Sequence, residues 1–523
     1  MTFKLPVFYL ENLRYDDRLM INLSSYIMRG KYLGNYCDLT LIKGIVFPLI
    51  LAIVRTIKIP FSSALTLLYI SACSFFMLSA KKVIKNRIIL TTLFLFLLFN
   101  PISYSSDAFQ RVYRNSVLYI ELLFFLGIIL KIIYEEKTNI LNYIILGFIM
   151  SVMLLTKEDS IWAIIIFIIL IIYKILKNTN RKNYIIYATT ILIILLNLNL
   201  VSCVNYFKYG IYTYDELRNS NFKKAYIKIL QIKDDEKKDN IAITKSTFYK
   251  LAENSKVFDF TKTQIDNRYN LLVEKNQEIT NGNIVWYLRN WIYQKNNFQS
   301  GKEANEYYKN LSDELDKLFE EGKLEKEISS QSLFLNIPTG NEIKEFPKNL
   351  LKAICYTASY KNMKTFSEDA ISKEYHYDKK TNAYSIIYAD YHNAENLIDR
   401  NIIGIEFIKN IYVFSTIIFG IFSLIIFLKN IVIKDKLNLI IYIVFISYLL
   451  IICGVTYTHT TAFCAIRYCY LCDIYILQTI FIFLNIYRLF ENLKKKGHEN
   501  NTIKLLESGE NIENKDISRN SSI

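Results

Sequence analysis

Charged residues are scarce in this sequence, and the scarcity excludes several common protein classes. Asp, Glu, Lys and Arg make up 21% of the 523 residues, whereas hydrophobic residues make up 52%. That balance excludes a single soluble globule and is typical of several membrane spans joined to a water-soluble part. The apolar stretch at residues 5–10 is too short for the core of a cleavable secretory signal, so none is predicted.

Cysteine is also sparse, and only Cys464, Cys469 and Cys472 of the eight cysteines lie close together. A zinc site needs four ligands, and only His459 lies nearby, so we expect these thiols to be small apolar residues of a membrane hairpin. The net charge is +15, but the sequence shows no basic stripe with interleaved aromatics, which argues against a nucleic-acid partner. Basic residues between apolar runs are instead typical of cytoplasmic loops.

Long apolar stretches dominate both ends of the chain. We interpret nine of them as membrane spans, at residues 60–80, 88–104, 116–133, 142–155, 160–176, 184–204, 405–428, 438–457 and 468–487. A further apolar piece at 45–58 predicts a juxtamembrane or re-entrant helix. Residues 205–400 lose the long apolar runs, and apolar residues recur at helical spacing over 222–230 and 304–318. The sequence therefore predicts an all-α polytopic membrane protein with a helix-rich soluble domain.

These features divide the chain into five parts. The parts are a first loop with the juxtamembrane helix (1–59), a transmembrane bundle (60–204), a soluble domain (205–400), C-terminal spans (401–490) and a disordered cytoplasmic tail (491–523). Loops on one side of the predicted spans hold 17 Lys and Arg residues, and those on the other side hold four. Because cytoplasmic loops are the basic ones, we expect the soluble domain and the first loop to be extracytoplasmic.

Polar clusters that interrupt the apolar pattern fall on the predicted outer side. They comprise Asp16, Asp17, Lys43, Arg111, Arg114, Lys157, Glu158, Asp159 and Arg467. Carboxylates can act as a general base or hold a divalent cation, and Arg and Lys can neutralise phosphate, so we predict one site at the membrane surface. Plainer interpretations stay open, because Arg111 and Arg114 can snorkel to the interface, Lys157 can pair with Glu158, and Asp16 can be merely solvated.

The order of the motifs resembles the GT-C superfamily of membrane glycosyltransferases, which includes protein mannosyltransferases and aminoarabinose transferases. The resemblance rests on the carboxylate pair Asp16-Asp17, the segment Gly30-Lys31-Tyr32-Leu33-Gly34, and Lys43 ahead of Pro48. A group of bacterial polytopic membrane proteins is more similar still, and its further motifs are matched by Thr40 to Gly44, Asn100-Pro101, Arg111 to Arg114 and Thr156-Lys157-Glu158. The likeness covers the first 200 residues best.

This resemblance implies an enzyme of the bacterial cytoplasmic membrane that moves a sugar from a polyprenyl-phosphate carrier to an extracytoplasmic glycan, lipid or protein of the envelope. It implies that Asp16 and Asp17 are catalytic or hold a divalent cation such as Mg²⁺ or Mn²⁺. The lipid phosphate would be bound by Lys43, Arg111, Arg114, Lys157, Glu158 and Arg467.

The chain differs from that family in one respect, and an alternative function stays open. The family has a span before the carboxylate pair, so an upstream span would complete its architecture in this chain, where 15 residues precede Asp16. The alternative is a non-catalytic membrane protein, either a transporter or an envelope-assembly component. We favour the enzyme because the sequence shows neither the internal repeats nor the broken helices that transporters usually have.

Overall fold

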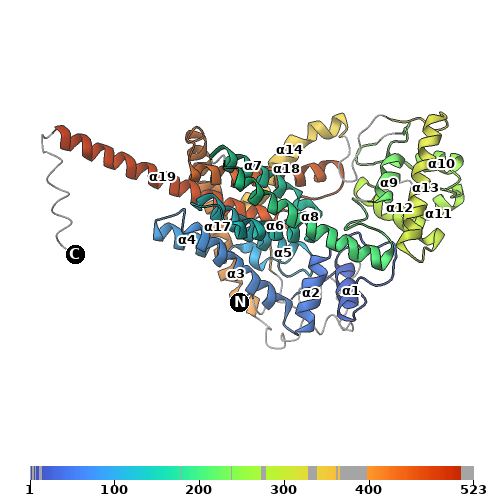
Figure 1. The fold of residues 1–523 in the computed structure, drawn as a ribbon, viewed down its shortest axis with the longest axis horizontal. Helices are drawn as coiled ribbons and strands as arrows, with labels where there is room; N and C mark the ends of the chain where they lie inside the picture. Colours follow the sequence, from blue (N-terminus) through green and yellow to red (C-terminus); the bar gives the residue numbers. More distant parts are fainter. Residues whose placement is uncertain are drawn as a thin grey trace.

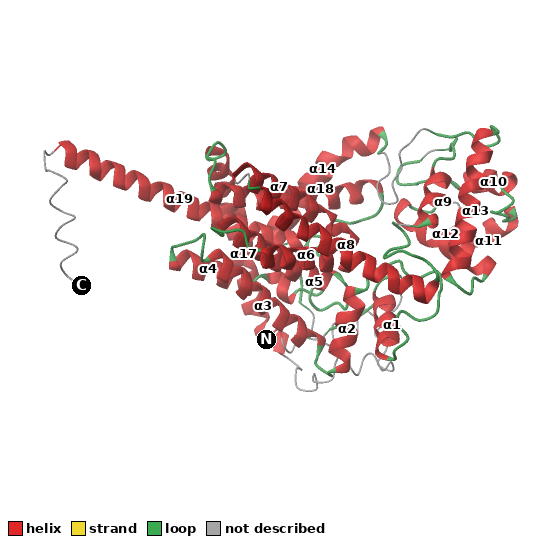
Figure 2. Cartoon of the chain, in the orientation of Figure 1, coloured by secondary structure: helices red, strands yellow, loops and turns green. Residues whose placement is uncertain are grey.

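The computed structural model of the protein describes residues 2, 5, 7–10, 15–177, 180–218, 220–236, 238–272, 278–327, 338–360, 363–365 and 397–507. Across these ranges the regular elements are helices, and the β-structure is limited to three isolated bridges (Figure 2). One bridge joins Phe8 to Arg111, which lays the N-terminal segment beside a turn of the membrane bundle. The prediction of an all-α protein is confirmed.

In the part of the chain that the structure describes, eight helices are long and apolar enough to cross a membrane. They are α3 (Phe61–Ala80), α4 with a following turn (Arg87–Tyr104), α5 (Asn115–Tyr134), α7 with a preceding turn (Glu158–Lys177), and the spans Asn183–Tyr209 of α8, Gly404–Lys429 of α17, Lys436–Thr461 of α18 and Cys472–Lys496 of α19. The ninth predicted span is α6 (Ile140–Thr156), an apolar helix of 17 residues that packs between α5 and α8. The chain is therefore a multi-pass membrane protein.

Helix α5 forms the centre of the bundle. In its most apolar stretch 89% of the residues are buried, compared with 17% in α8 and 22% in α17. Helices α3 and α6 pack on α5, and α17 and α18 pack on α19 (Figure 1). The exposed apolar side chains of α8 and α17 are what a lipid-facing helix requires, because such side chains gain nothing from turning inward in a bilayer.

Two short helices, α1 (Asp17–Met28) and α2 (Val46–Thr56), pack side by side at one edge of the bundle. The guanidinium of Arg55 is buried and donates to the hydroxyls of Ser24 and Ser25 at 2.5 and 2.9 Å, which fixes α2 against α1. Helix α2 occupies the predicted juxtamembrane stretch and leaves an apolar stripe exposed, formed by Leu49, Ile53 and Ile57. Such a stripe suits a helix that lies in the membrane interface.

The described part of the predicted soluble domain contains α9 (Asn221–Leu230), α10 (Lys245–Asn254), α11 (Lys262–Leu272), α12 (Asn281–Asn296) and α13 (Gly301–Glu320). Helices α9 and α13 confirm the two predicted apolar series, and they pack against each other. Helix α14 (Gly340–Ser359) was not predicted, and it packs on α17 and α18 of the bundle (Figure 1). Within its described residues, the predicted soluble region 205–400 therefore contains α9–α13 and also α14, which belongs to the bundle, besides the ends of α8 and α17.

The expectation of a disordered tail from residue 491 is wrong for its first part. Helix α19 runs from Cys472 to Glu507, well past the end of its span at Lys496. Extending an existing helix needs no new nucleus, so a polar segment can stay helical once the membrane span has started it. The rest of the predicted tail, 508–523, lies outside the described residues.

Candidate functional site

Four ion pairs bring the sequence-predicted residues together at the end of the bundle that faces α9–α13. The pairs are Lys43–Asp16 at 3.1 Å, Arg111–Asp17 at 2.6 Å, Arg114–Glu158 at 2.5 Å and Lys157–Asp159 at 2.7 Å. The four cations are buried, with side chains 4–8% exposed. We call these eight residues the ion-pair cluster. Arg467 is exposed and takes part in none of the ion pairs among the described residues.

Local structure explains why these segments meet. Asp16 precedes the first residue of α1, Arg114 precedes the first residue of α5, and Glu158 and Asp159 begin the turn that leads into α7. Carboxylates in the first turn of a helix are stabilised by the positive end of the helix dipole. The cluster is therefore built mainly from helix ends, where the spans stop and polar side chains can face one another.

The loop that carries Lys43 packs closely against the C-terminal end of α6, because Gly44 in that loop has no side chain. A Cβ atom on Gly44 would lie 1.9 Å from the carbonyl oxygen of Leu155, so only glycine permits this approach. Leu155 is two residues before Lys157, and the contact thus sets Lys43 next to the α6–α7 turn.

We expect Gly44→Ala to destabilise the folded protein by about 1–3 kcal/mol, the usual cost of forcing an extra group into a packed contact. The thermal midpoint of the detergent-solubilised protein measures this effect. The matched control is Gly454→Ala, because a Cβ atom at that helical position meets no atom within 4 Å. Equal midpoints for the two variants would show that the loop is not packed on α6 as described.

Asp159 has the most exposed carboxylate of the cluster, with 65% of its side chain exposed, whereas Asp16 faces solvent only in part. The Oδ1 atom of Asp16 accepts hydrogen bonds from Lys43 Nζ and from the Tyr113 hydroxyl, both at 3.1 Å. Its Oδ2 accepts none from the residues that the structure describes, and the side chain is 27% exposed. Burial opposes ionisation, but Lys43, Arg114 and Arg111 outweigh it and lower the pKa of Asp16 below its ordinary value. Asp16 is therefore an ionised carboxylate at neutral pH.

Asp17 has a different environment from its neighbour. It is fully buried, and Arg111 donates to its two oxygens from Nε at 2.8 Å and from Nη2 at 2.6 Å. The backbone N–H of Leu10 adds a third bond at 2.9 Å. A two-pronged Arg–carboxylate contact is among the strongest and most directional hydrogen-bonded pairs in proteins. This geometry suits a residue that holds the first loop to the 111–114 turn.

The predicted divalent cation does not fit the carboxylate pair in this arrangement. Arg111 and Leu10 occupy the oxygens of Asp17, and Lys43 shares Asp16 with Tyr113. Within the described residues, no three His, Cys, Asp or Glu side chains gather closely enough to hold a metal ion. Hard divalent cations need several oxygen ligands at once, and this carboxylate pair does not offer them.

The ion pairs form one connected network. Arg114 lies within electrostatic range of both Asp16 and Lys157, and Lys43 lies within range of Glu158. Burial lowers the pKa of Lys157, but Asp159 outweighs it and raises that pKa above the ordinary value. Lys157 therefore remains charged at neutral pH.

Aromatic rings from distant parts of the chain cover two of the cations, Lys43 and Lys157. Lys43 Nζ lies 4.9 Å from the ring centroid of Trp286 in α12, and Tyr15 stacks on the same indole at 5.6 Å. Lys157 Nζ lies 5.2 Å from the ring of Tyr470. Cation–π contacts stabilise a partly dehydrated ammonium. Nothing in the sequence indicates these partners, because contact between segments so far apart leaves no local pattern.

Helix α12 also supplies the arginine that anchors the soluble domain to the first loop. Arg289 is buried and donates to Glu216 Oε2 at 2.7 Å and to the carbonyl oxygens of Asp38 and Thr40 at 2.6 and 3.1 Å. The hydroxyl of Tyr36 donates to the other oxygen of Glu216 at 2.9 Å. Burial lowers the pKa of Arg289, but Glu216 outweighs it and raises that pKa well above the usual range.

Three further carboxylates near the cluster escaped prediction. Burial, with Glu158 adding to it, raises the pKa of Asp215 to about 7. Glu121 of α5 is buried in the bundle and accepts a hydrogen bond from Thr156 at 2.6 Å, and Asp473 of α19 lies within electrostatic range of it. Glu121 could have been flagged in the sequence, because it is the one acidic residue of the apolar stretch 116–133.

Comparisons with known proteins add little to this geometry. No protein-family model matches the chain, and no curated protein matches it in sequence. A solved structure that resembles it is the crystal structure of ArnT from Cupriavidus metallidurans in the apo state, with 11% identity over 92% of this chain and 74% of that chain. The TM-score is 0.30, a value too low to establish a common fold.

Proposed function

We propose that the protein is a membrane glycosyltransferase that takes a sugar from a polyprenyl-phosphate carrier and transfers it to an acceptor of the cell envelope. The observation that carries the proposal is the ion-pair cluster, because four buried cations lie together with the partly exposed carboxylate of Asp16 where the spans end. The motif order shared with the GT-C superfamily supports the same class of reaction. The site faces both lipid spans and a soluble domain, as a lipid-linked donor and a polar acceptor require.

In the proposed reaction, the donor phosphate draws cations away from their carboxylate partners. Arg114 and Lys43 are the candidates for this exchange, since the network connects both of them to Asp16. The negative charge on the phosphate grows as the bond between the anomeric carbon and the phosphate oxygen breaks. Preorganised cations in a site shielded from water stabilise such charge strongly. The bonding electrons leave with the polyprenyl phosphate.

The same exchange would prepare Asp16 to act as a base. A carboxylate held by Lys43 and Tyr113 is a weak base, because its pKa is lowered. Loss of a cation to the donor phosphate raises that pKa towards a value at which proton transfer is effective. The acceptor hydroxyl then gives its proton to Asp16 while its oxygen attacks the anomeric carbon. Asp17 takes a positioning role in this scheme, since its oxygens are occupied by Arg111.

Transfer itself can be measured with membranes that contain the protein and a polyprenyl-phosphate pool carrying a radiolabelled sugar. We expect label to move from the organic-soluble carrier to a polar or envelope-bound product. Membranes with the same amount of Arg114→Ala protein are the control, because that variant leaves Glu158 without its partner. The absence of transfer with every sugar carrier tested would refute the proposal.

We further propose that the protein lies in a bacterial cytoplasmic membrane with α9–α13 on the extracytoplasmic side, as the 17 to four distribution of basic residues indicates. The test is labelling of Lys238→Cys in intact cells with a thiol reagent that cannot cross membranes. Lys238 is exposed, and the background variant carries serine at the exposed cysteines Cys203, Cys355 and Cys464. We expect labelling without lysis. Labelling that requires lysis would invert the topology.

The buried carboxylates of the bundle support one alternative, a transporter. Glu121 Oε2 has no hydrogen-bond partner among the described residues, and Asp473 lies nearby within another span. Ionisable residues inside spans often mark ion or proton pathways. The two functions differ in their response to Glu121→Gln: a proton-coupled transporter loses uptake with this change, whereas the proposed transferase keeps the Asp16 chemistry.

A further inference from the structure

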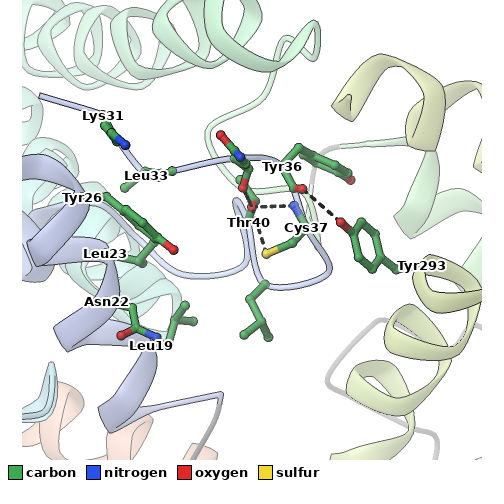
Figure 3. Close-up of a pocket in the computed structure, with 13 residues that line it drawn as sticks. Leu19, Asn22, Leu23, Tyr26, Lys31, Leu33, Tyr36, Cys37, Thr40 and Tyr293 are labelled. Carbon is green, nitrogen blue, oxygen red and sulfur yellow. Dashed lines mark hydrogen bonds between the residues drawn. The ribbon is translucent and has the colours of Figure 1, made fainter. Parts of the chain in front are cut away.

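A cavity of about 400 Å³ lies between α1 and the loop that leads to Lys43, and none of the residues of the ion-pair cluster lines it (Figure 3). Helix α1 and the loop of residues 31–40 form its walls, and Tyr293 of α12 closes another side. Leu19, one turn along α1 from Asp16, lines the cavity, and so does Thr40, three residues before Lys43. The cavity thus runs along α1, the helix that begins directly after Asp16.

The shape of the cavity depends on the segment Gly30 to Gly34, which the ion-pair cluster does not use. Gly34 has a φ of +87°, and a Cβ atom there would lie 2.7 Å from the ring of Tyr26, so glycine lets that ring cover the loop. The hydroxyl of Tyr209 donates to the Gly34 carbonyl at 2.9 Å. The hydroxyl of Tyr293 donates to the Tyr36 carbonyl at 3.2 Å, as Figure 3 shows. These bonds fix the wall from two other parts of the chain.

Polar groups that bond to no described residue line the cavity. The side-chain amides of Asn22 and Asn35 and the ammonium of Lys31 are all exposed, and Lys31 is the one charged group in the lining. Figure 3 shows Asn22, Tyr26 and Lys31 around the same space. Amides can both donate to and accept from hydroxyl groups, and a tyrosine ring offers a flat apolar surface. A lone ammonium without a carboxylate favours a ligand that carries negative charge.

We propose that this cavity binds the acceptor, and that the acceptor is a saccharide bearing a phosphate or carboxylate group. Its volume lies at the lower end of the range for small-molecule sites, about 300–1,000 Å³, which limits the bound part to a small sugar unit. Lys31 takes the anionic group, Asn22 and Asn35 take hydroxyls, and the ring of Tyr26 contacts the apolar face of the sugar. The name acceptor site rests on the proposed transferase function, whereas the binding of an anionic sugar does not.

Equilibrium dialysis of the full-length protein in lipid nanodiscs tests the proposal, with radiolabelled glucose 6-phosphate, glucose and inorganic phosphate as probes. We expect glucose 6-phosphate to bind more tightly than either of the other two. Lys31→Ala is expected to weaken that binding about fivefold or more. This is the contribution expected of a hydrogen bond to a charged group, made smaller because Lys31 is exposed to solvent. Asn22→Trp, which places a large ring in the cavity, is expected to abolish it.

The matched control is Arg18, an exposed residue of α1 that does not line the cavity. Arg18→Ala and Arg18→Trp are expected to bind glucose 6-phosphate as the parent does. Equal binding by Lys31→Ala and the parent, or by Asn22→Trp and the parent, would overturn the proposal, as would no binding of any probe. Sugar binding without any transfer activity would keep the anionic-sugar site and remove the transferase, so the two failures can be told apart.

Discussion

Asp16→Asn is expected to lower sugar transfer about 100- to 10,000-fold, the usual contribution of a general base, while the protein inserts and folds normally. The substitution keeps the shape of the side chain and removes its ability to take a proton. Lys43 and Tyr113 can still donate to the amide oxygen that replaces Oδ1, so the local packing is preserved. The measurement is transfer of radiolabelled sugar from the polyprenyl-phosphate pool, normalised to the amount of inserted protein.

Asp107→Asn provides the matched control for this experiment. Asp107 lies 4.0 Å from Arg111, and its side chain is 22% exposed, close to the 27% of Asp16. Since Asp107 has no role in the proposed chemistry, transfer should fall less than about twofold, in line with the small effect of most partly exposed substitutions. Full transfer by Asp16→Asn would exclude this residue as the base and would remove the main chemical support for the site.

Glu216→Gln is expected to destabilise the protein by about 3–5 kcal/mol, because it leaves the buried guanidinium of Arg289 without its countercharge. The side chains of the pair are 2% and 0% exposed, so water cannot replace the lost partner. One nitrogen of Arg289, Nη1, already has no hydrogen-bond partner among the described residues, so the loss of the Glu216 charge adds to an existing unsatisfied group. The thermal midpoint in detergent, measured at a fixed scan rate, reports the loss.

The control for this variant is Glu253→Gln, which breaks the exposed pair of Glu253 with Lys262 on the same domain. Both side chains of that pair are more than half exposed, at 54% and 62%, and exposed pairs contribute about 0–1 kcal/mol. The midpoint of Glu253→Gln should therefore stay near that of the parent. If the two variants melted alike, Arg289 would not anchor the domain to the first loop in the way described.

The membrane architecture could be predicted because lipid imposes a strong local signal. A span needs a continuous apolar run, so the stretch 405–428 agrees with the observed span Gly404–Lys429 to within one residue at each end. Helix α14 shows where this signal fails. Its sequence carries lysines and a proline as well as apolar residues, yet the helix packs on α18, and a contact between two helices is not encoded in either one alone.

The candidate site could be predicted as a set of residues but not as a set of pairs. The charges that interrupt apolar runs had to collect at the ends of spans, and eight of them do meet. Solvent exposure of a carboxylate depends on tertiary contacts, which the sequence of the adjacent residues Asp16 and Asp17 does not show. In the structure Asp16 is partly exposed and Asp17 is buried against Arg111. The contact of Trp286 with Lys43 could not be predicted for the same reason, because it depends on how α12 packs against the first loop.

The position of α12 determines whether the α9–α13 domain can be removed without changing the site in the membrane bundle. Trp286, which covers Lys43, and Arg289, which binds Glu216, lie one turn apart on that helix. The same helix, α12, thus covers Lys43 and anchors the domain to the first loop. A shortened chain that kept every span and omitted α9–α13 would present Lys43 and the cavity to bulk water. The domain is a component of the site, and it cannot be exchanged as an independent module.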